Sequence, residues 1–186
     1  VRMTGAEVIF ADVNAATGLM EPAHFENAIA LAGGGVKAVF PVHLKGQCAD
    51  MKAIATVAKA HDIKVITDAC HALGGIHLDN GVDRAPLGSC TFEDIACFSF
   101  HPAKAIAMGE GGGISTNDLN VAALSRQLRS HGIRRDAGAF INKDMAFDEK
   151  GQPNPWYYEC QSLGYNFRVP DILCALALSQ FEKLDQ

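Results

Sequence analysis

A lysine and an aspartate each follow a short apolar segment of this chain, and both side chains could take part in covalent chemistry. Lys104 lies in the polar turn Ser99-Phe-His-Pro-Ala-Lys104, and Asp68 ends the apolar segment 64–68. A lysine amine that is partly removed from water loses its proton more readily and becomes a usable nucleophile. An amine and a facing carboxylate suit a pyridoxal phosphate site, where the lysine forms a Schiff base and the acid faces the pyridinium nitrogen. On these residues alone, Lys104 as a solvated lysine and Asp68 as a turn or cap residue remain alternatives.

Strand and helix patterns alternate along the chain and would position these two residues. Apolar runs predict strands over 7–13, 36–42, 63–67, 95–100 and 113–116. Helical periodicity predicts helices over 22–31, 51–61, 119–130 and 169–184, with Asp50 and Asn117 or Asp118 as caps. Strands that are apolar on both faces indicate a three-layer α/β sandwich, a mostly parallel sheet with helices on both faces. Ligands bind at the carboxyl ends of such strands, where Asp68 and Ser99 fall.

Two glycine runs and one long polar segment connect these elements. Gly33-Gly-Gly35 is expected to end the first helix, because glycine tolerates the left-handed backbone found there. The run 109–113 does not open a helix as G-x-G-x-x-G and is not followed by G-K-[ST], so it predicts a tight return rather than a nucleotide loop. Residues 132–160 show little periodicity and predict a long irregular loop that is either functional or mobile.

Composition narrows the class of protein. The 186 residues suffice for one domain with a sizeable core, and the hydrophobic fraction of 48% is typical of an α/β protein. The net charge is −5 and the basic residues are scattered, so no nucleic-acid partner is predicted. No apolar run reaches the roughly 20 residues that a membrane helix needs, so no membrane partner is predicted. We expect a cytoplasmic protein.

The cysteines and histidines predict neither disulfides nor a metal site. No two cysteines form a C-x-x-C pair, and we expect them to be small buried hydrophobic residues in a reducing cytoplasm; they are Cys48, Cys70, Cys90, Cys97, Cys160 and Cys174. The histidines and cysteines show no zinc-ligand spacing on both sides, so no metal is expected.

Four motifs in this order resemble the DegT/DnrJ/EryC1/StrS sugar aminotransferases, a family of fold type I pyridoxal-phosphate enzymes. They are Val65-Ile-Thr-Asp-Ala-Cys-His-Ala-Leu-Gly74, Phe98-Ser-Phe-His-Pro-Ala-Lys104, Gly109-Glu-Gly-Gly112 and Leu163-Gly-Tyr-Asn-Phe-Arg168. The resemblance covers nearly the whole chain. It implies pyridoxal 5'-phosphate as cofactor, and transfer of an amino group from glutamate to a nucleotide-linked 4-keto-6-deoxy sugar.

The resemblance also implies roles for individual residues. Lys104 would carry the cofactor as a Schiff base and then move the proton, and Asp68 would keep the ring nitrogen protonated. His71 would lie near the ring hydroxyl oxygen, and Ser99 would bind the phosphate. Asn166 matches an asparagine that reaches the phosphate of the partner subunit, which implies a homodimer with shared active sites.

The substrate is suggested by residues 129–136 and 155–159. These resemble the branch that aminates UDP-4-keto-6-deoxy-N-acetyl-hexosamines on the route to pseudaminic acid, a part of cell-surface polysaccharide biosynthesis. Trp156 and Tyr157 could stack on a sugar or uracil face, or could instead hold the loop on the body of the protein. His101 and Arg168 complete the candidate substrate-binding residues, Arg168 by pairing with a phosphate or a carboxylate.

The resemblance leaves the extent of the protein and two other functions open. Family members are longer, so we expect residues 1–186 to be part of the large pyridoxal-phosphate domain, without the N-terminal segment and the C-terminal small domain. A sugar dehydratase on the same scaffold carries histidine in place of the lysine, so Lys104 favours transamination. A non-catalytic fragment or interaction protein is the other alternative, against which Lys104, Asp68, Ser99 and Asn166 argue.

Overall fold

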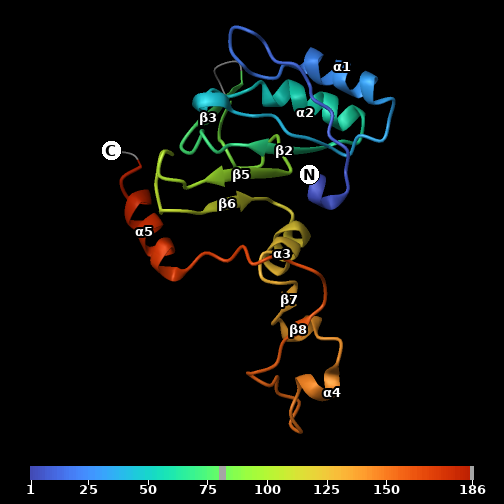
Figure 1. Cartoon of the computed structure of the whole chain (residues 1–186), viewed down its shortest axis with the longest axis vertical. Coiled ribbons are helices and arrows are strands. Elements are labelled where there is room, and N and C mark those ends of the chain that lie inside the picture. The colour runs from blue at the N-terminus through green and yellow to red at the C-terminus, as the bar shows by residue number, and fades with distance from the viewer. Residues whose placement is uncertain (80–82, 185–186) are drawn as a thin grey trace. The chain divides into compact units, whose positions relative to one another are not determined.

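The computed structural model describes residues 1–79 and 83–184, which divide into two compact units. The sheet unit holds the described residues of 1–117 and 171–184, and the small unit holds 118–170. The sheet has the order β1-β2-β5-β6; its strands are β1 (Ala38–Val39), β2 (Lys64–Asp68), β5 (Ile95–Ser99) and β6 (Gly112–Ser115) (Figure 1). The first three strands run parallel and β6 is antiparallel to β5. The predicted α/β class with a mostly parallel sheet is confirmed.

Helices α1 (Pro22–Ala32) and α2 (Met51–Ala60) pack over one face of this sheet. The core between them is apolar and buried; it holds Phe25, Val39, Ala49, Met51, Ile54, Ala58, Ile63 and Val65. Asp50 Oδ1 accepts from the amide of Ala53 at 3.1 Å, as its predicted cap role requires. Gly33 ends α1 in the left-handed region at φ 66, which confirms the predicted stop.

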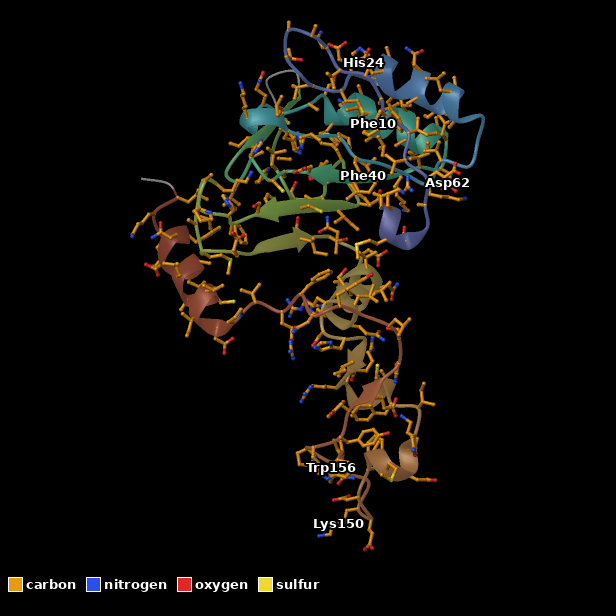
Figure 2. The ribbon with its side chains drawn as sticks, in the orientation of Figure 1. Phe10, His24, Phe40, Asp62, Lys150 and Trp156 are labelled. Atoms are coloured by element: carbon orange, nitrogen blue, oxygen red, sulfur yellow. The ribbon has the colours of Figure 1, made fainter. Side chains whose placement is uncertain are left out.

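Two predicted strands are corrected by the structure. Residues 7–13 form no strand, and Phe10 in this segment is 89% exposed (Figure 2). The strand predicted over 36–42 covers only Ala38–Val39 in the structure, and an isolated β-bridge between Val42 and Asp68 follows it. A strand needs backbone hydrogen bonds to a neighbouring strand. Residues 7–13 are apolar enough for a strand, but no described strand lies beside them.

A hairpin that we did not predict follows β2. Its strands β3 (Ile76–Asp79) and β4 (Asp83–Pro86) pair antiparallel. The residues between them, 80–82, lie outside the described part of the chain. The Asn-Gly pair at positions 80 and 81 is a known hairpin signal and could have revealed this element.

The small unit is more ordered than the predicted irregular loop. Helix α3 (Leu119–Leu128) is capped by Asp118, whose Oδ1 accepts from the Asn120 amide at 2.8 Å. The paired strands β7 (Ile133–Arg134) and β8 (Glu159–Cys160) then join the two ends of the segment. Between them lie a 3₁₀ turn (Ala137–Ala139) and α4 (Lys143–Ala146). The prediction of an irregular loop over 132–160 is therefore wrong in part, because two-residue strands are too short to show a period.

The last helix and the cysteines were also predicted from the sequence. Helix α5 (Asp171–Phe181) confirms the predicted helix, although Cys174 on it is exposed rather than buried. All six cysteines are free, and Cys160 is also exposed. None of the helices in the described residues is long and apolar enough to cross a membrane.

Candidate functional site

Asp68 stands where β2 leaves the sheet, and its backbone is held on one side by the chain that follows β1. Its amide donates to the carbonyl of Pro41 at 2.9 Å, and its carbonyl accepts from the amide of His43 at 3.0 Å. The carboxylate Oδ1 accepts from the amide of Cys70 at 3.0 Å. Backbone and side chain are thus both fixed, which leaves the half-buried carboxylate at the carboxyl edge of the sheet, where ligands bind in such folds.

Lys104 lies on a loop that is closed on both sides. The amide of Phe100 donates to the Gly111 carbonyl at 2.9 Å, and the amide of Met108 donates to the Phe100 carbonyl at 3.0 Å. Within the loop, the Lys104 amide donates to the His101 carbonyl at 2.9 Å. These bonds anchor the loop next to the end of β5, and Lys104 is half-buried there. The strand-to-loop position expected of a positioned amine is present.

The amine of Lys104 and the carboxylate of Asp68 act on the same thiol. The pKa of Cys70 is raised to about 11, first by burial and then by the hydrogen bond to Asp68 and its negative charge; the positive charge of Lys104 acts in the opposite direction. In the sheet, Asp68 ends β2 and the loop of Lys104 follows β5, the parallel strand that pairs with β2. The sequence analysis gave Cys70 no role in the site, although it lies within the family motif over 65–74.

Ser99 and His101 shape the first turn after β5. The hydroxyl of Ser99 accepts from the His101 amide at 3.3 Å, and His101 Nδ1 accepts from the Ala103 amide at 3.1 Å. Ser99 is half-buried, whereas His101 is exposed. A hydroxyl among backbone amides is a suitable phosphate cradle, and the predicted role of Ser99 fits this turn chemically.

The glycine run provides a close return, as predicted. A side chain on Gly112 would place its Cβ 2.6 Å from the carbonyl oxygen of Phe98, so only glycine allows β6 to lie against β5 there. Gly109 adopts φ 86, in the left-handed region.

His71 lies on the turn after β2, three residues beyond Asp68. It is exposed, and its Nδ1 accepts from the amide of Lys45 at 3.3 Å. This bond directs the ring toward the turn that holds Lys45. Its predicted role beside the cofactor ring remains a prediction.

The other predicted site residues belong to the small unit. Arg168 Nε donates to Asn166 Oδ1 at 3.0 Å, and both residues are exposed. Trp156 is 61% exposed (Figure 2), whereas the ring of Tyr157 packs edge-on against Phe140 at 4.9 Å. The structure therefore gives Tyr157 a role in holding its own unit together. It brings Asp68, His71, Ser99, His101 and Lys104 into the sheet unit, and the assignment of all nine residues to one site stays a prediction.

Glu159 organises the loop that carries Trp156. Its oxygens accept from the amides of Ile141 and Asn142 at 2.9 Å, and from the Tyr157 hydroxyl at 2.9 Å. Burial opposes ionisation, but these donors and the side chain of Gln161 outweigh it and lower the pKa of Glu159 from 4.5 to about 2.

We expect this part of the small unit to loosen in acid. A carboxylate whose pKa is lowered on folding stabilises the fold above its ordinary value of 4.5, and this contribution is lost as pH falls toward about 2. Trp156, the only tryptophan of the chain, reports the change by its fluorescence. Glu159→Gln should remove most of this acid transition, and Glu149→Gln, at an exposed position of the same unit, should preserve it. An unchanged transition in Glu159→Gln would contradict the role given to this carboxylate.

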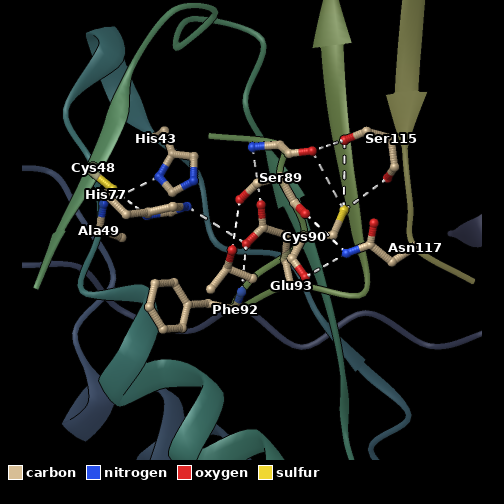
Figure 3. A network of polar contacts seen from close by, with 12 residues as sticks. His43, Cys48, Ala49, His77, Ser89, Cys90, Phe92, Glu93, Ser115 and Asn117 are labelled. Atoms are coloured by element: carbon tan, nitrogen blue, oxygen red, sulfur yellow. Dashed lines mark hydrogen bonds and ion pairs between the residues drawn. The ribbon is translucent and has the colours of Figure 1, made fainter. Parts of the chain in front are cut away.

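A second polar cluster, which the sequence analysis missed, lies inside the sheet unit. It joins Cys48, His77 and Glu93 (Figure 3). No spacing pattern marks these residues, since they come from three separate segments. No group of three or more histidine, cysteine, aspartate or glutamate side chains suited to a metal ion occurs in the part of the chain that the structure describes.

The comparisons with known proteins show the family of this chain. The family model of the DegT/DnrJ/EryC1/StrS aminotransferases matches residues 1–186. The chain belongs to this aminotransferase family. Its aminotransferases use pyridoxal 5'-phosphate, and related structures have been solved in PLP and PMP forms.

Three of the similar proteins come from different bacteria. The spore coat polysaccharide biosynthesis protein SpsC of Bacillus subtilis (strain 168) is 35% identical over 98% of this chain. GDP-perosamine synthase of Caulobacter vibrioides is 35% identical over 100% of it. Among solved structures, Helicobacter pylori PseC, an aminotransferase involved in the biosynthesis of pseudoaminic acid, gives a TM-score of 0.79 at 27% identity over 99% of the chain. The chain spans 42% of the length of each of these three proteins.

The residues of the sheet unit fit the cofactor of the family. An amine (Lys104), a carboxylate (Asp68) and a hydroxyl beside backbone amides (Ser99) are the groups that an aldehyde, a pyridine nitrogen and a phosphate require. The first two follow adjacent parallel strands of the sheet.

Proposed function

We propose that this chain provides the lysine and the aspartate of a PLP-dependent sugar aminotransferase. The enzyme would move an amino group from glutamate to a nucleotide-linked 4-keto-6-deoxy sugar. The observation that carries the proposal is that Asp68 ends β2 and the anchored loop of Lys104 follows β5, the adjacent parallel strand, at the same edge of the sheet. Membership of the aminotransferase family supports the reaction class.

Lys104, Asp68 and Ser99 would have separate roles toward the cofactor. Bound pyridoxal phosphate supplies an electron sink, which allows the carbon next to the transferred nitrogen to lose its proton. Lys104 would hold the cofactor and then take and return that proton, since its loop is anchored at Phe100 and Met108. Asp68 would hold the proton on the ring nitrogen, because its position is fixed through its own backbone and through Cys70. Ser99 would bind the phosphate.

The finer assignment rests on likeness to relatives. The fold of PseC and its link to pseudoaminic acid support a UDP-linked N-acetyl-hexosamine as the sugar, on the pseudaminic acid route. SpsC and GDP-perosamine synthase support a nucleotide-linked sugar of surface polysaccharides more generally. A homodimer in which Asn166 reaches the partner's site, and a cytoplasmic location, complete the proposal; the six free cysteines suit a reducing compartment.

Covalent capture of the cofactor tests the proposal. The purified chain is incubated with pyridoxal phosphate, reduced with borohydride and digested, and modified peptides are identified by mass spectrometry. We expect modification at Lys104 at far lower cofactor concentration than at any other lysine, because nearby Asp68 and Ser99 add binding contacts. Modification spread evenly over exposed lysines such as Lys59 and Lys150 would contradict the proposal.

A further inference from the structure

Three side chains from separate segments form a buried chain of polar contacts in the sheet unit. Cys48 precedes α2, His77 lies on β3, and Glu93 precedes β5. Cys48 Sγ is 2.9 Å from His77 Nδ1, and His77 Nε2 is 3.7 Å from Glu93 Oε2 (Figure 3). The His77 side chain is 3% exposed and that of Glu93 is 0% exposed. A nucleophile, a base and an orienting carboxylate in this sequence are the parts of an activated thiol.

Glu93 is fixed as a carboxylate. Its two oxygens accept from the amides of Gly88 at 3.2 Å and Phe92 at 3.3 Å. Burial alone would raise the pKa of Glu93, but the ion pair with His77 and the hydrogen bonds from these amides outweigh burial and lower it. A negative charge therefore faces His77 on the side away from the sulfur.

His77 carries the balancing positive charge. Burial would lower its pKa, but the contacts with Cys48 and Glu93 outweigh burial and raise it to about 9. With both ring nitrogens protonated, Nδ1–H is the donor and Cys48 Sγ is the acceptor. A cysteine in hydrogen-bond reach of a histidine that a carboxylate orients has the arrangement of an activated nucleophile.

The second histidine of the cluster does not compete for this role. His43 is 0% exposed, and its ring centroid is 5.8 Å from that of His77. Burial and the charge of His77 lower the pKa of His43 to about 4, against the raising effects of Glu93 and Asp68, so His43 is neutral. Its Nδ1 already accepts from the Ala49 amide at 3.2 Å. The ring of Phe92 packs edge-on against that of His77, with the ring centroids 5.4 Å apart.

We propose that Cys48 is a modification site, the thiol of this chain that reacts fastest with small electrophiles such as hydrogen peroxide, because His77 and Glu93 hold its sulfur as a nucleophile. The sulfur attacks one peroxide oxygen, so that an S–O bond forms while the O–O bond breaks. The departing hydroxide takes the proton from His77 and leaves as water. Cys48 is thereby oxidised by two electrons to a sulfenic acid, and the peroxide is reduced.

Exposure alone predicts the opposite order of reactivity. Cys160 and Cys174 are exposed, whereas Cys48 is half-buried. Burial raises the pKa of Cys70, Cys90 and Cys97, which makes those three slow. Comparing the reaction rates of Cys48 and Cys160 therefore distinguishes activation by His77 from the effect of solvent exposure.

The first test uses the unmodified 186-residue chain. Limiting iodoacetamide, and separately hydrogen peroxide with dimedone as a sulfenic-acid trap, are applied near neutral pH, and each cysteine is quantified by peptide mass spectrometry. Because His77 Nδ1 lies 2.9 Å from the sulfur of Cys48, we expect Cys48 to react at least about tenfold faster than Cys160. Faster reaction at Cys160 than at Cys48 would overturn the proposal.

The second test removes the histidine. His77→Gln should lower the Cys48 rate to that of Cys160 or below and leave Cys160 unchanged, whereas His61→Gln, at the exposed end of α2, should change neither rate. Circular dichroism shows whether the variant is folded. An unchanged Cys48 rate in folded His77→Gln overturns the proposal, and if the variant unfolds, the comparison in the unmodified chain decides it.

Discussion

Lys104→Ala is expected to remove covalent retention of pyridoxal phosphate and to slow amino-group transfer from glutamate by about 10³-fold or more. Proton transfer by a positioned side chain contributes about 10²–10⁴-fold by itself, and this variant also loses the attachment point of the cofactor. The loop should keep its shape, because it is closed by backbone bonds from Phe100 and Met108. Retention is read from the absorbance of the desalted protein, and transfer from glutamate-dependent release of 2-oxoglutarate.

Lys59→Ala is the matched control for this prediction. Lys59 is an exposed lysine in the last turn of α2, and its loss removes one positive charge without touching the loop of Lys104. Normal retention in Lys59→Ala and none in Lys104→Ala would support the assignment. Equal retention in both variants would rule out Lys104 as the attachment point.

Glu93→Ala is expected to lower the free energy of unfolding by about 3–5 kcal/mol, the usual cost of removing one partner from a buried charge pair. The change leaves His77 buried without a counter-charge and removes the acceptor of the Gly88 and Phe92 amides. Urea denaturation measures the loss. Glu26→Ala, at an exposed position on α1, is the control and should change stability by less than about 0.5 kcal/mol.

The same pair predicts how stability depends on pH. The pKa of His77 is raised on folding, so its contribution is complete below its ordinary value of 6.5 and is lost as pH rises through about 9. The pKa of Glu93 is lowered, so its contribution is present above its ordinary value of 4.5 and is lost as pH falls below it. Stability from the pair should therefore be greatest between 4.5 and 6.5. If Glu93→Ala lost as much unfolding free energy between pH 6.5 and 9 as the unmodified chain, this account would be refuted.

Elements specified by neighbouring residues were predictable from the sequence. Asp50 caps α2 and Gly33 ends α1, because both act on backbone groups within a few residues. The placement of Asp68 and Ser99 at strand ends was predictable for the same reason, since β2 and β5 are short apolar runs that end in polar residues. The candidate lysine and its acid could thus be named from local pattern and family motifs.

Tertiary structure alone decided features that need a distant partner. Residues 7–13 have the composition of a strand but no described neighbour to pair with, and the hairpin of β3 and β4 exists through cross-strand bonds. Cys48 and His77 are 29 positions apart in the chain, and no local rule predicts a 2.9 Å contact between them. Local propensity acts through bonds within a few residues, whereas ionisation and reactivity depend on which charges folding brings together, and this requires the three-dimensional arrangement of the chain.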